Sequence, residues 1–193
     1  MDRKRPLKWF GLLLNGLIAG LTMSYPFLIW FSLDYFQPRT LALVLAGLFL
    51  LRFLASGMQA NAGLMRFIVP ICVLFLLAIA WLNQAGGLMV YPVFVSLLFF
   101  TVFSISLAYP PTVVERLARL EDPDLPAKGV AYTRRVTQIW SVFFLSNAAV
   151  SLFTVWYGDR WLWSLYNGCV FYVLMGLLMA AEMAVRRKVK ASY

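Results

Sequence analysis

Histidine is absent from the 193-residue sequence, and cysteine occurs only twice. Without an imidazole, the chain has no histidine general base, no histidine metal ligand and no histidine for a catalytic triad. Cys72 and Cys169 each lie inside an apolar run, so we expect two small buried side chains rather than a disulfide. A structural zinc site needs about four Cys or His ligands. The sequence therefore predicts no metal site and no cofactor.

Charged residues are scarce as well. They make up 13% of the chain, about half of the ~25% that is usual in soluble domains. Hydrophobic residues account for 62%, well above the ~45–50% of a soluble domain. This composition excludes a soluble globular domain, a disordered tail, a collagen-like chain and a disulfide-rich scaffold. It is typical of a membrane protein.

The apolar residues fall into six long runs, none of which alternates polar and apolar residues as a membrane β-strand would. A membrane-spanning helix needs about 20 apolar residues, and backbone groups in lipid are satisfied within helices. The sequence predicts an all-α bundle of about six transmembrane helices that forms a single domain over residues 1–193. The expected helices cover about residues 9–33, 38–55, 67–82, 88–108, 136–157 and 161–185.

Lysine and arginine are unevenly distributed over the loops between these runs. With six spans, fifteen of them fall on the side of the two termini, and only Arg39 and Arg160 fall on the other side. The positive-inside rule then places both termini in the cytoplasm. Topology alone accounts for the basic side, so the sequence indicates the lipid bilayer, and not a nucleic acid, as the partner. The same residues also suit anionic lipid headgroups.

Small and polar residues inside the runs indicate helix packing. Gly16 and Gly20 have the spacing that lets two helices approach closely, and Asn15 lies beside them. Asn147 and Asn167 occur in the fifth and sixth runs. Asparagine in a membrane helix can donate hydrogen bonds to a neighbouring helix. We therefore expect all five residues to contribute to contacts between helices.

Glu182 is the only acidic residue within an expected span. It precedes Arg186 by four residues, which is the favourable order for an ion pair on one helix. An acidic side chain within a spanning helix otherwise indicates function. The sequence favours a structural pair with Arg186 and leaves catalysis or proton coupling as the alternative.

The longest loop, residues 109–135, is expected on the cytoplasmic side. Two consecutive prolines end the fourth span, and Thr112 with Glu115 forms the pattern of a capping box. Apolar residues then recur at helical spacing, which predicts a short helix at the membrane interface. An Asp-Pro and a Leu-Pro pair are expected to terminate this helix, and the fifth span is expected to start near Val136.

This loop and the end of the last span hold the charged residues that are candidates for a site. The arginines suited to an anion such as phosphate are Arg116, Arg119, Arg134 and Arg135. The same arginines could serve topology alone, and both interpretations stay open. The weak catalytic candidates are the carboxylates of Glu115, Asp122, Asp124 and Glu182.

Several segments of the second half resemble an uncharacterised family of bacterial inner-membrane proteins associated with aryl-polyene and xanthomonadin-type pigment clusters. The resemblance covers about half of the chain, and its segments are residues 109–120, 122–126, 132–140, 143–147 and 163–167, with Glu182 and Arg186-Arg187. Members of that family are often encoded beside ketosynthases and acyl carrier proteins. The resemblance therefore implies the inner membrane, a lipid-like product and an acyl carrier protein or pathway enzymes as partners. It supplies no catalytic residues.

Three functions remain open. The first is an accessory inner-membrane protein that tethers or assists a cytoplasmic acyl-chain or polyene lipid pathway. The second is a membrane enzyme that acts on a lipid or a carrier-linked acyl group through carboxylates and arginines. The third is a small exporter or flippase, which is disfavoured because the centres of the expected helices hold no acid or arginine. The sequence leans away from an enzyme.

Overall fold

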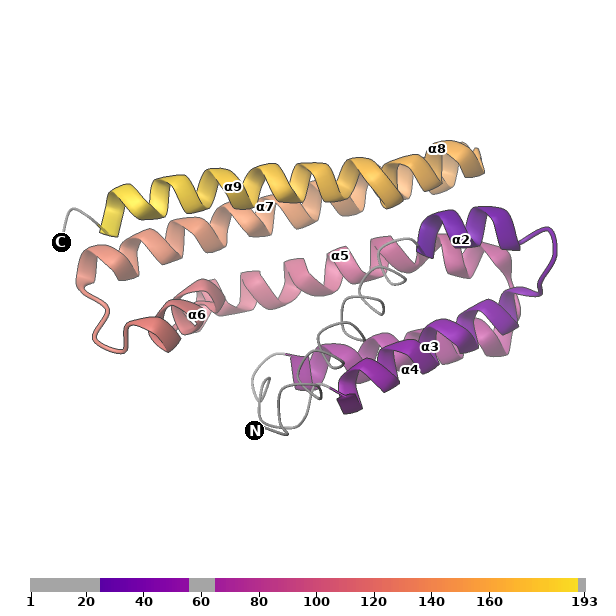
Figure 1. Ribbon diagram of the computed structural model, residues 1–193, viewed down its shortest axis with the longest axis horizontal. Coiled ribbons are helices and arrows are strands. Elements are labelled where there is room, and N and C mark those ends of the chain that lie inside the picture. Colours follow the sequence, from indigo (N-terminus) through magenta and orange to yellow (C-terminus); the bar gives the residue numbers. More distant parts are fainter. Residues whose placement is uncertain (1–24, 56–64, 191–193) are drawn as a thin grey trace, which may run out of the picture. The chain divides into compact units, whose positions relative to one another are not determined.

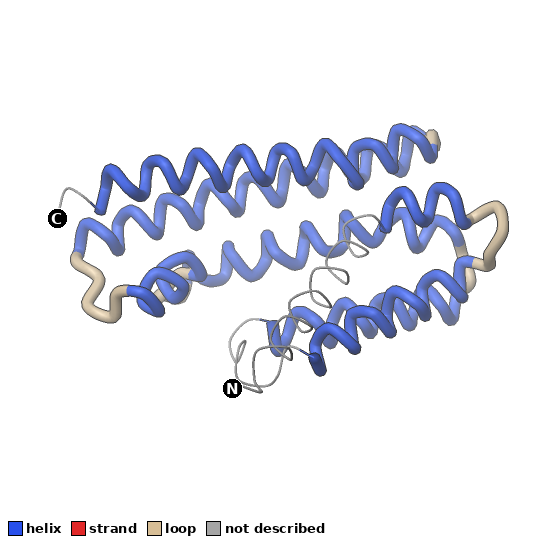
Figure 2. Tube along the Cα trace, viewed as in Figure 1, coloured by secondary structure: helices blue, strands red, loops and turns tan. Residues whose placement is uncertain are grey.

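The computed structural model describes residues 25–55 and 65–190, and the regular structure in these residues is entirely helical (Figure 1, Figure 2). This confirms the predicted all-α class for the described part of the chain. The elements are α2 (Tyr25–Ser32), α3 (Pro38–Ala55), α4 (Met65–Leu82), α5 (Ala85–Ala108), α6 (Val113–Glu121), α7 (Ala127–Tyr157), α8 (Arg160–Leu165), the π-helical segment η1 (Tyr166–Val170) and α9 (Phe171–Lys190).

Within residues 25–55 and 65–190, three helices are long and apolar enough to cross a membrane. They are α5, α7 and the continuous stretch Arg160–Lys190 that contains α8, η1 and α9. Two shorter apolar helices, Pro38–Leu51 and Phe67–Leu82, lie within α3 and α4. The expected first span lies outside the described residues except for α2, and so do Asn15, Gly16 and Gly20. By length and composition, the described residues thus suggest a membrane protein.

The chain divides into two compact units. The first contains residues 1–91 and 159–168, and the second contains residues 92–158 and 169–193. One boundary falls in α5 before Pro92, which has no N–H for the carbonyl four residues earlier. Another falls within η1, where the α-helical hydrogen-bond pattern is interrupted. Both of these boundaries therefore coincide with a break in the α-helical pattern.

In the first unit, α3 and α4 pack against each other, and α2 packs against α8. Small side chains on α3, such as Ala42 and Ala46, are buried together with Leu76 and Ile79 of α4. Ser164 donates a hydrogen bond of 3.1 Å to the carbonyl of Pro26 in α2. Small residues and polar contacts of this kind allow helices to pack closely in a membrane.

In the second unit, α6 and α9 pack against α7, and polar side chains join α5 to α7. Asn147 of α7 donates to the Oγ of Ser96 on α5 at 2.8 Å, and Ser96 donates to the carbonyl of Pro92. The packed face of α7 carries five hydroxyl groups, three in its first half and two near its C-terminal end, with an asparagine between them. Its buried polar members are Thr133, Thr137, Ser141, Asn147, Ser151 and Thr154.

The main difference from the sequence-based expectation is the start of α7. The helix begins at Ala127, nine residues before the expected start at Val136, so the second part of the expected loop is helical. Pro126 is the N-cap of α7. Proline suits a helix start because its missing N–H would be unpaired there in any case. The Leu125-Pro126 pair thus opens the next helix, whereas the sequence was interpreted as ending the previous one there.

The cysteines differ from each other. Cys72 is buried in α4, and Cys169 in η1 is exposed, and both are free thiols. The expectation of burial therefore holds for Cys72 alone. The exposure of Cys169 continues in the helix that follows it, because α9 has no buried residue. A surface of exposed apolar side chains is what a lipid-facing helix requires.

Candidate functional site

The short helix α6 holds the first set of site residues in place. Thr112 is buried and caps the helix by accepting a hydrogen bond from the N–H of Glu115 at 3.3 Å. The helix ends at Glu121, and Asp122 is its C-cap. The N–H of Val113 donates to Ser106 at the end of α5. The predicted short helix is therefore present, capped by Thr112 and attached to α5.

The charged residues of α6 are largely engaged within their own segment. The carboxylate of Glu115 is buried and pairs with Arg119, 2.9 Å away. In a full capping box it would instead accept a hydrogen bond from the backbone N–H of Thr112. Arg119 also donates to the carbonyl of Pro123. Arg116 donates to the carbonyl of Pro111 at 2.9 Å. Arg116 and Arg119, two of the four candidates for anion docking, thus bind groups within the segment around α6.

Arg134 and Arg135 lie elsewhere. They are exposed residues of α7, in the part that extends the helix beyond its expected start. Two consecutive residues on a helix point about 100° apart, because one turn takes 3.6 residues. The two side chains therefore leave the helix in different directions.

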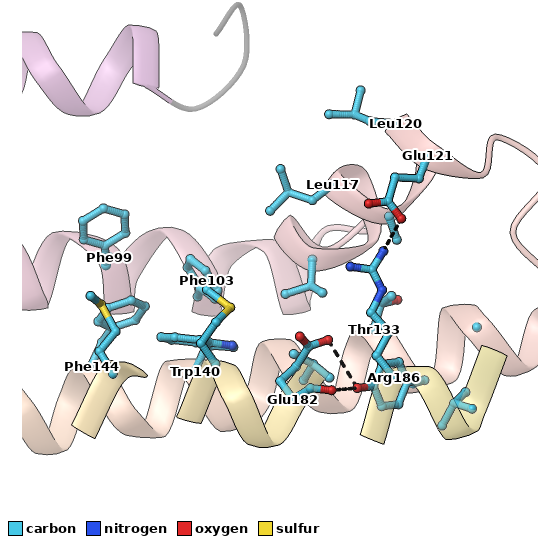
Figure 3. Close-up of a pocket in the computed structure, with 18 of the residues that line it drawn as sticks. Phe99, Phe103, Leu117, Leu120, Glu121, Thr133, Trp140, Phe144, Glu182 and Arg186 are labelled. Atoms are coloured by element: carbon cyan, nitrogen blue, oxygen red, sulfur yellow. Dashed lines mark hydrogen bonds and ion pairs between the residues drawn. The ribbon is translucent and has the colours of Figure 1, made fainter. Parts of the chain in front are cut away.

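A pocket of about 730 Å³ lies among α5, α6, α7 and α9 in the second unit (Figure 3). This volume is within the ~300–1,000 Å³ of typical ligand sites. Its walls are largely apolar and include a group of aromatic rings. Phe144 of α7 stacks on Phe99 of α5 with ring centroids 5.1 Å apart. Phe103 meets the same ring edge-on at 5.3 Å. The aromatic lining consists of Phe99, Phe103, Tyr132, Trp140, Phe144, Phe171 and Tyr172.

Charged side chains line one part of this pocket. They are Glu121, Asp122, Glu182, Arg186 and Lys190. Figure 3 shows the side chain of Arg186 reaching from α9 to Glu121 at the end of α6. The Oε2 atom of Glu121 lies 2.7 Å from a guanidinium nitrogen of Arg186 and 3.1 Å from the Nζ of Lys190. The pocket therefore combines an aromatic interior with a charged rim.

This arrangement corrects the expected pairing of Glu182 with Arg186. Arg186 pairs with Glu121 of α6, and Glu182 accepts from the hydroxyl of Tyr132 on α7 at 3.3 Å. The same hydroxyl lies 3.1 Å from the backbone carbonyl of Glu182. Spacing along one helix could not reveal this, because both partners come from other helices.

The two basic neighbours also set the protonation of Glu121. The hydrogen bond from Lys190 and the charges of Arg186 and Lys190 lower the pKa of Glu121 below its ordinary value of 4.5. Glu121 is therefore ionised at neutral pH. Its ion pairs are lost only as the pH falls through its lowered pKa, because the carboxylate then takes up a proton. Since the side chain of Glu121 is 61% exposed, these ion pairs hold α6 to α9 only weakly.

The candidate carboxylates are only partly brought together. Asp122 and Glu182 line the pocket, Glu115 is paired with Arg119, and Asp124 is exposed in the turn after α6. In the ranges that the structure describes, no group of three or more Cys, Asp or Glu side chains is placed to hold a metal ion. Asn167 belongs to the first unit and donates to the carbonyl of Trp163.

Glu121 and Lys190 are site residues that the sequence pattern does not single out. Glu121 looks like an ordinary solvated residue at the end of a short helix, and Lys190 belongs to a basic terminal segment. The aromatic wall does leave a signal: Phe99 and Phe103, like Trp140 and Phe144, are four residues apart. That spacing places each pair on one helix face, although it cannot show that the two faces meet.

Comparison of the chain with protein-family models, with characterised proteins and with solved structures finds no match. The resemblance drawn from residues 109–187 therefore rests on those residues alone. The described part of the chain defines the class: its regular structure is helical, its apolar helices can cross a membrane by length and composition, and it holds an apolar pocket with a charged rim.

Proposed function

We propose that this chain is a multi-pass protein of the bacterial inner membrane that holds a long apolar chain for an acyl or polyene lipid pathway. The observation that carries the proposal is the pocket of about 730 Å³, with its aromatic interior and charged rim. An amphiphile matches such a site, because apolar and aromatic side chains contact its tail while its headgroup keeps polar partners at the charged rim.

The distribution of basic residues supports an orientation for this site. The rim residues Arg186 and Lys190 precede the C-terminus, which the positive-inside rule assigns to the cytoplasm along with the N-terminus. In this orientation the charged rim opens toward the cytoplasmic leaflet. A cytoplasmic pathway enzyme or acyl carrier protein would then meet the pocket on the side where Arg134 and Arg135 are exposed. Anionic lipid is the rival ligand for those two arginines.

A membrane enzyme is the second candidate. Asp122 and Glu182 both line the pocket, so two carboxylates are available to a bound chain for proton transfer. The accessory role is preferred because Glu182 already accepts a hydrogen bond from Tyr132. The carboxylate of Glu182 therefore has a structural role, whereas Asp122 caps α6 through its backbone N–H, which donates to the carbonyl of Ala118.

The test is binding of a neutral fluorescent chain, the methyl ester of a conjugated tetraene fatty acid, to the purified protein in nanodiscs of neutral lipid. The emission of such a probe rises when it leaves water for an apolar site. Met175 lines the pocket from α9, and Met175→Trp fills part of it. We expect this variant to weaken binding at least about tenfold, which corresponds to ~1.4 kcal/mol.

Leu177→Trp is the matched control, because Leu177 is an exposed residue of the same helix outside the pocket lining. It should bind the ester as the wild type does, after subtraction of the signal from protein-free nanodiscs. Equal binding by both variants, or a signal no larger than that of protein-free nanodiscs, would contradict the proposal.

A further inference from the structure

The rim of the pocket contains a carboxylate that is held by two basic side chains. Glu121 comes from α6, whereas Arg186 and Lys190 lie one turn apart on α9. Both cations contact the same oxygen, Oε2, of Glu121. The structure thus already shows how this pair of side chains binds a carboxylate at the edge of an apolar pocket.

We propose that Arg186 and Lys190 form the headgroup site for a single-chain amphiphile that ends in a carboxylate, and that Glu121 competes with the ligand for this site. This inference rests on the proposed function of the pocket. Glu121 acts as an intramolecular stand-in for the ligand carboxylate, because a bound headgroup would take the same hydrogen-bond donors. Exchange of one carboxylate for another leaves each of the two cations with a carboxylate partner.

The exposure of these groups makes the exchange feasible. The side chains of Glu121, Arg186 and Lys190 are 61%, 33% and 44% exposed, and ion pairs exposed to this degree contribute little to stability. Displacing Glu121 therefore costs little, and its carboxylate can be solvated by water once it is released. A carboxylate anchored to a tail inside the pocket gains from its fixed position beside the two cations.

The remaining charges at the rim do not occupy the two cations. Glu182 accepts a hydrogen bond from Tyr132, and Asp122 is the residue that ends α6. Apolar side chains of α6 complete the rim, among them Leu120, which is 82% exposed. Release of Glu121 would free the end of α6 from α9. The N-terminal end would stay attached to α5 through the hydrogen bond from the N–H of Val113 to Ser106.

The experiment compares two probes that differ only in the headgroup: a conjugated tetraene fatty acid and its methyl ester. Binding is measured by fluorescence at pH 7 and low salt in neutral nanodiscs. The variants are Glu121→Gln, which removes the competing charge, Arg186→Gln, which removes a headgroup partner, and Arg187→Gln as the control. Arg187 is an exposed neighbour on α9 outside the pocket lining.

We expect Glu121→Gln to strengthen binding of the acid by about threefold to fivefold and to leave binding of the ester unchanged. Arg186→Gln should weaken binding of the acid about tenfold, since charge-assisted hydrogen bonds are the stronger ones, again without effect on the ester. Arg187→Gln should change neither. A purely structural role for the Glu121 contacts predicts the opposite sign for Glu121→Gln, with both probes bound less tightly.

The outcomes separate the two proposals. If the ester does not bind the wild type, the proposed function fails. If the ester binds but the ratio of acid to ester affinity is the same in all variants, the headgroup inference alone is overturned. If hexadecyl phosphate displaces the acid probe at lower concentration than palmitate does, the assignment of a carboxylate headgroup is overturned in favour of a phosphate.

Discussion

At the scale of single residues, Glu182 is the side chain whose interpretation changes most. On one helix its spacing to Arg186 indicates an ion pair, but α6 supplies Glu121 for that arginine and α7 supplies Tyr132 for Glu182. The hydroxyl of Tyr132 meets both the side chain and the backbone carbonyl of Glu182. The contact therefore fastens α9 to α7 through one hydroxyl group.

The effect of Glu182→Gln on the free energy of unfolding should accordingly be small. Glu182→Gln retains an oxygen that accepts from Tyr132, whereas Tyr132→Phe removes the donor. We expect Tyr132→Phe to lower the free energy of unfolding by about 1 kcal/mol and Glu182→Gln to lower it by less. Thermal unfolding of the purified variants in one detergent checks this order.

The amount of product that the proposed lipid pathway forms in cells with the Glu182→Gln variant tests the competing catalytic role. If output disappears while the variant is abundant and as stable as the wild type, Glu182 is a catalytic residue and not a packing residue. Unchanged output supports the structural role.

At the scale of elements, the sequence predicts best where one helix determines the result. The expected span at residues 88–108 corresponds to α5, and the short helix after Thr112 is present as α6. Both depend on local signals, namely hydropathy, proline and capping. The start of α7 was missed because proline marks both the end of one helix and the start of the next. The pocket could not be predicted, because it depends on four helices that meet in space.

Packing of η1 against α2 supplies a test at this scale. A Cβ atom at Gly168 would lie 2.5 Å from the ring carbon Cε2 of Phe27, so a methyl group requires the ring to move. Gly168→Ala should therefore lower stability by about 1–3 kcal/mol, as overpacking does. The comparison of thermal unfolding temperatures between this variant and the wild type measures the effect.

Gly176→Ala in α9 is the control for that substitution. A Cβ atom there has nothing within 4 Å, and alanine favours a helix over glycine by about 1 kcal/mol or less. This variant should be as stable as the wild type or more stable. Equal destabilisation by both alanines would mean that the contact with Phe27 has no special cost.

At the scale of the whole molecule, the question is how many times the chain crosses the membrane. The structure shows three helices that are long and apolar enough, and α3 and α4 are the intermediate cases. Each of these two helices has 18 residues. At 1.5 Å per residue each is about 27 Å long, just short of the ~30 Å hydrocarbon core. Hydropathy and length together therefore do not determine whether α3 and α4 cross the membrane. The distribution of lysine and arginine in the adjoining segments is the next criterion.

The lysines and arginines favour crossing by both helices. Arg52 and Arg66 bracket the connection from α3 to α4, and Arg39, in the first turn of α3, is the one basic residue near the opposite end of that pair. Six spans place the connection inside and the two flanking loops outside. A reporter enzyme that is active only in the periplasm, fused after truncation at Phe36, Asn61 or Asn83, should therefore be active, inactive and active in that order.

Fusions farther along the chain calibrate the assay. Truncation at Gly158, after α7, should give an active reporter, and truncation at Lys128, in the first turn of α7, should give an inactive one, because the six-span and the four-span topology both take α7 as a span. Three fusions of equal activity at Phe36, Asn61 and Asn83 would show that α3 and α4 lie on one side and would reduce the six spans to four. An active fusion at Lys128 would reverse the orientation, and with it the cytoplasmic position of the pocket rim.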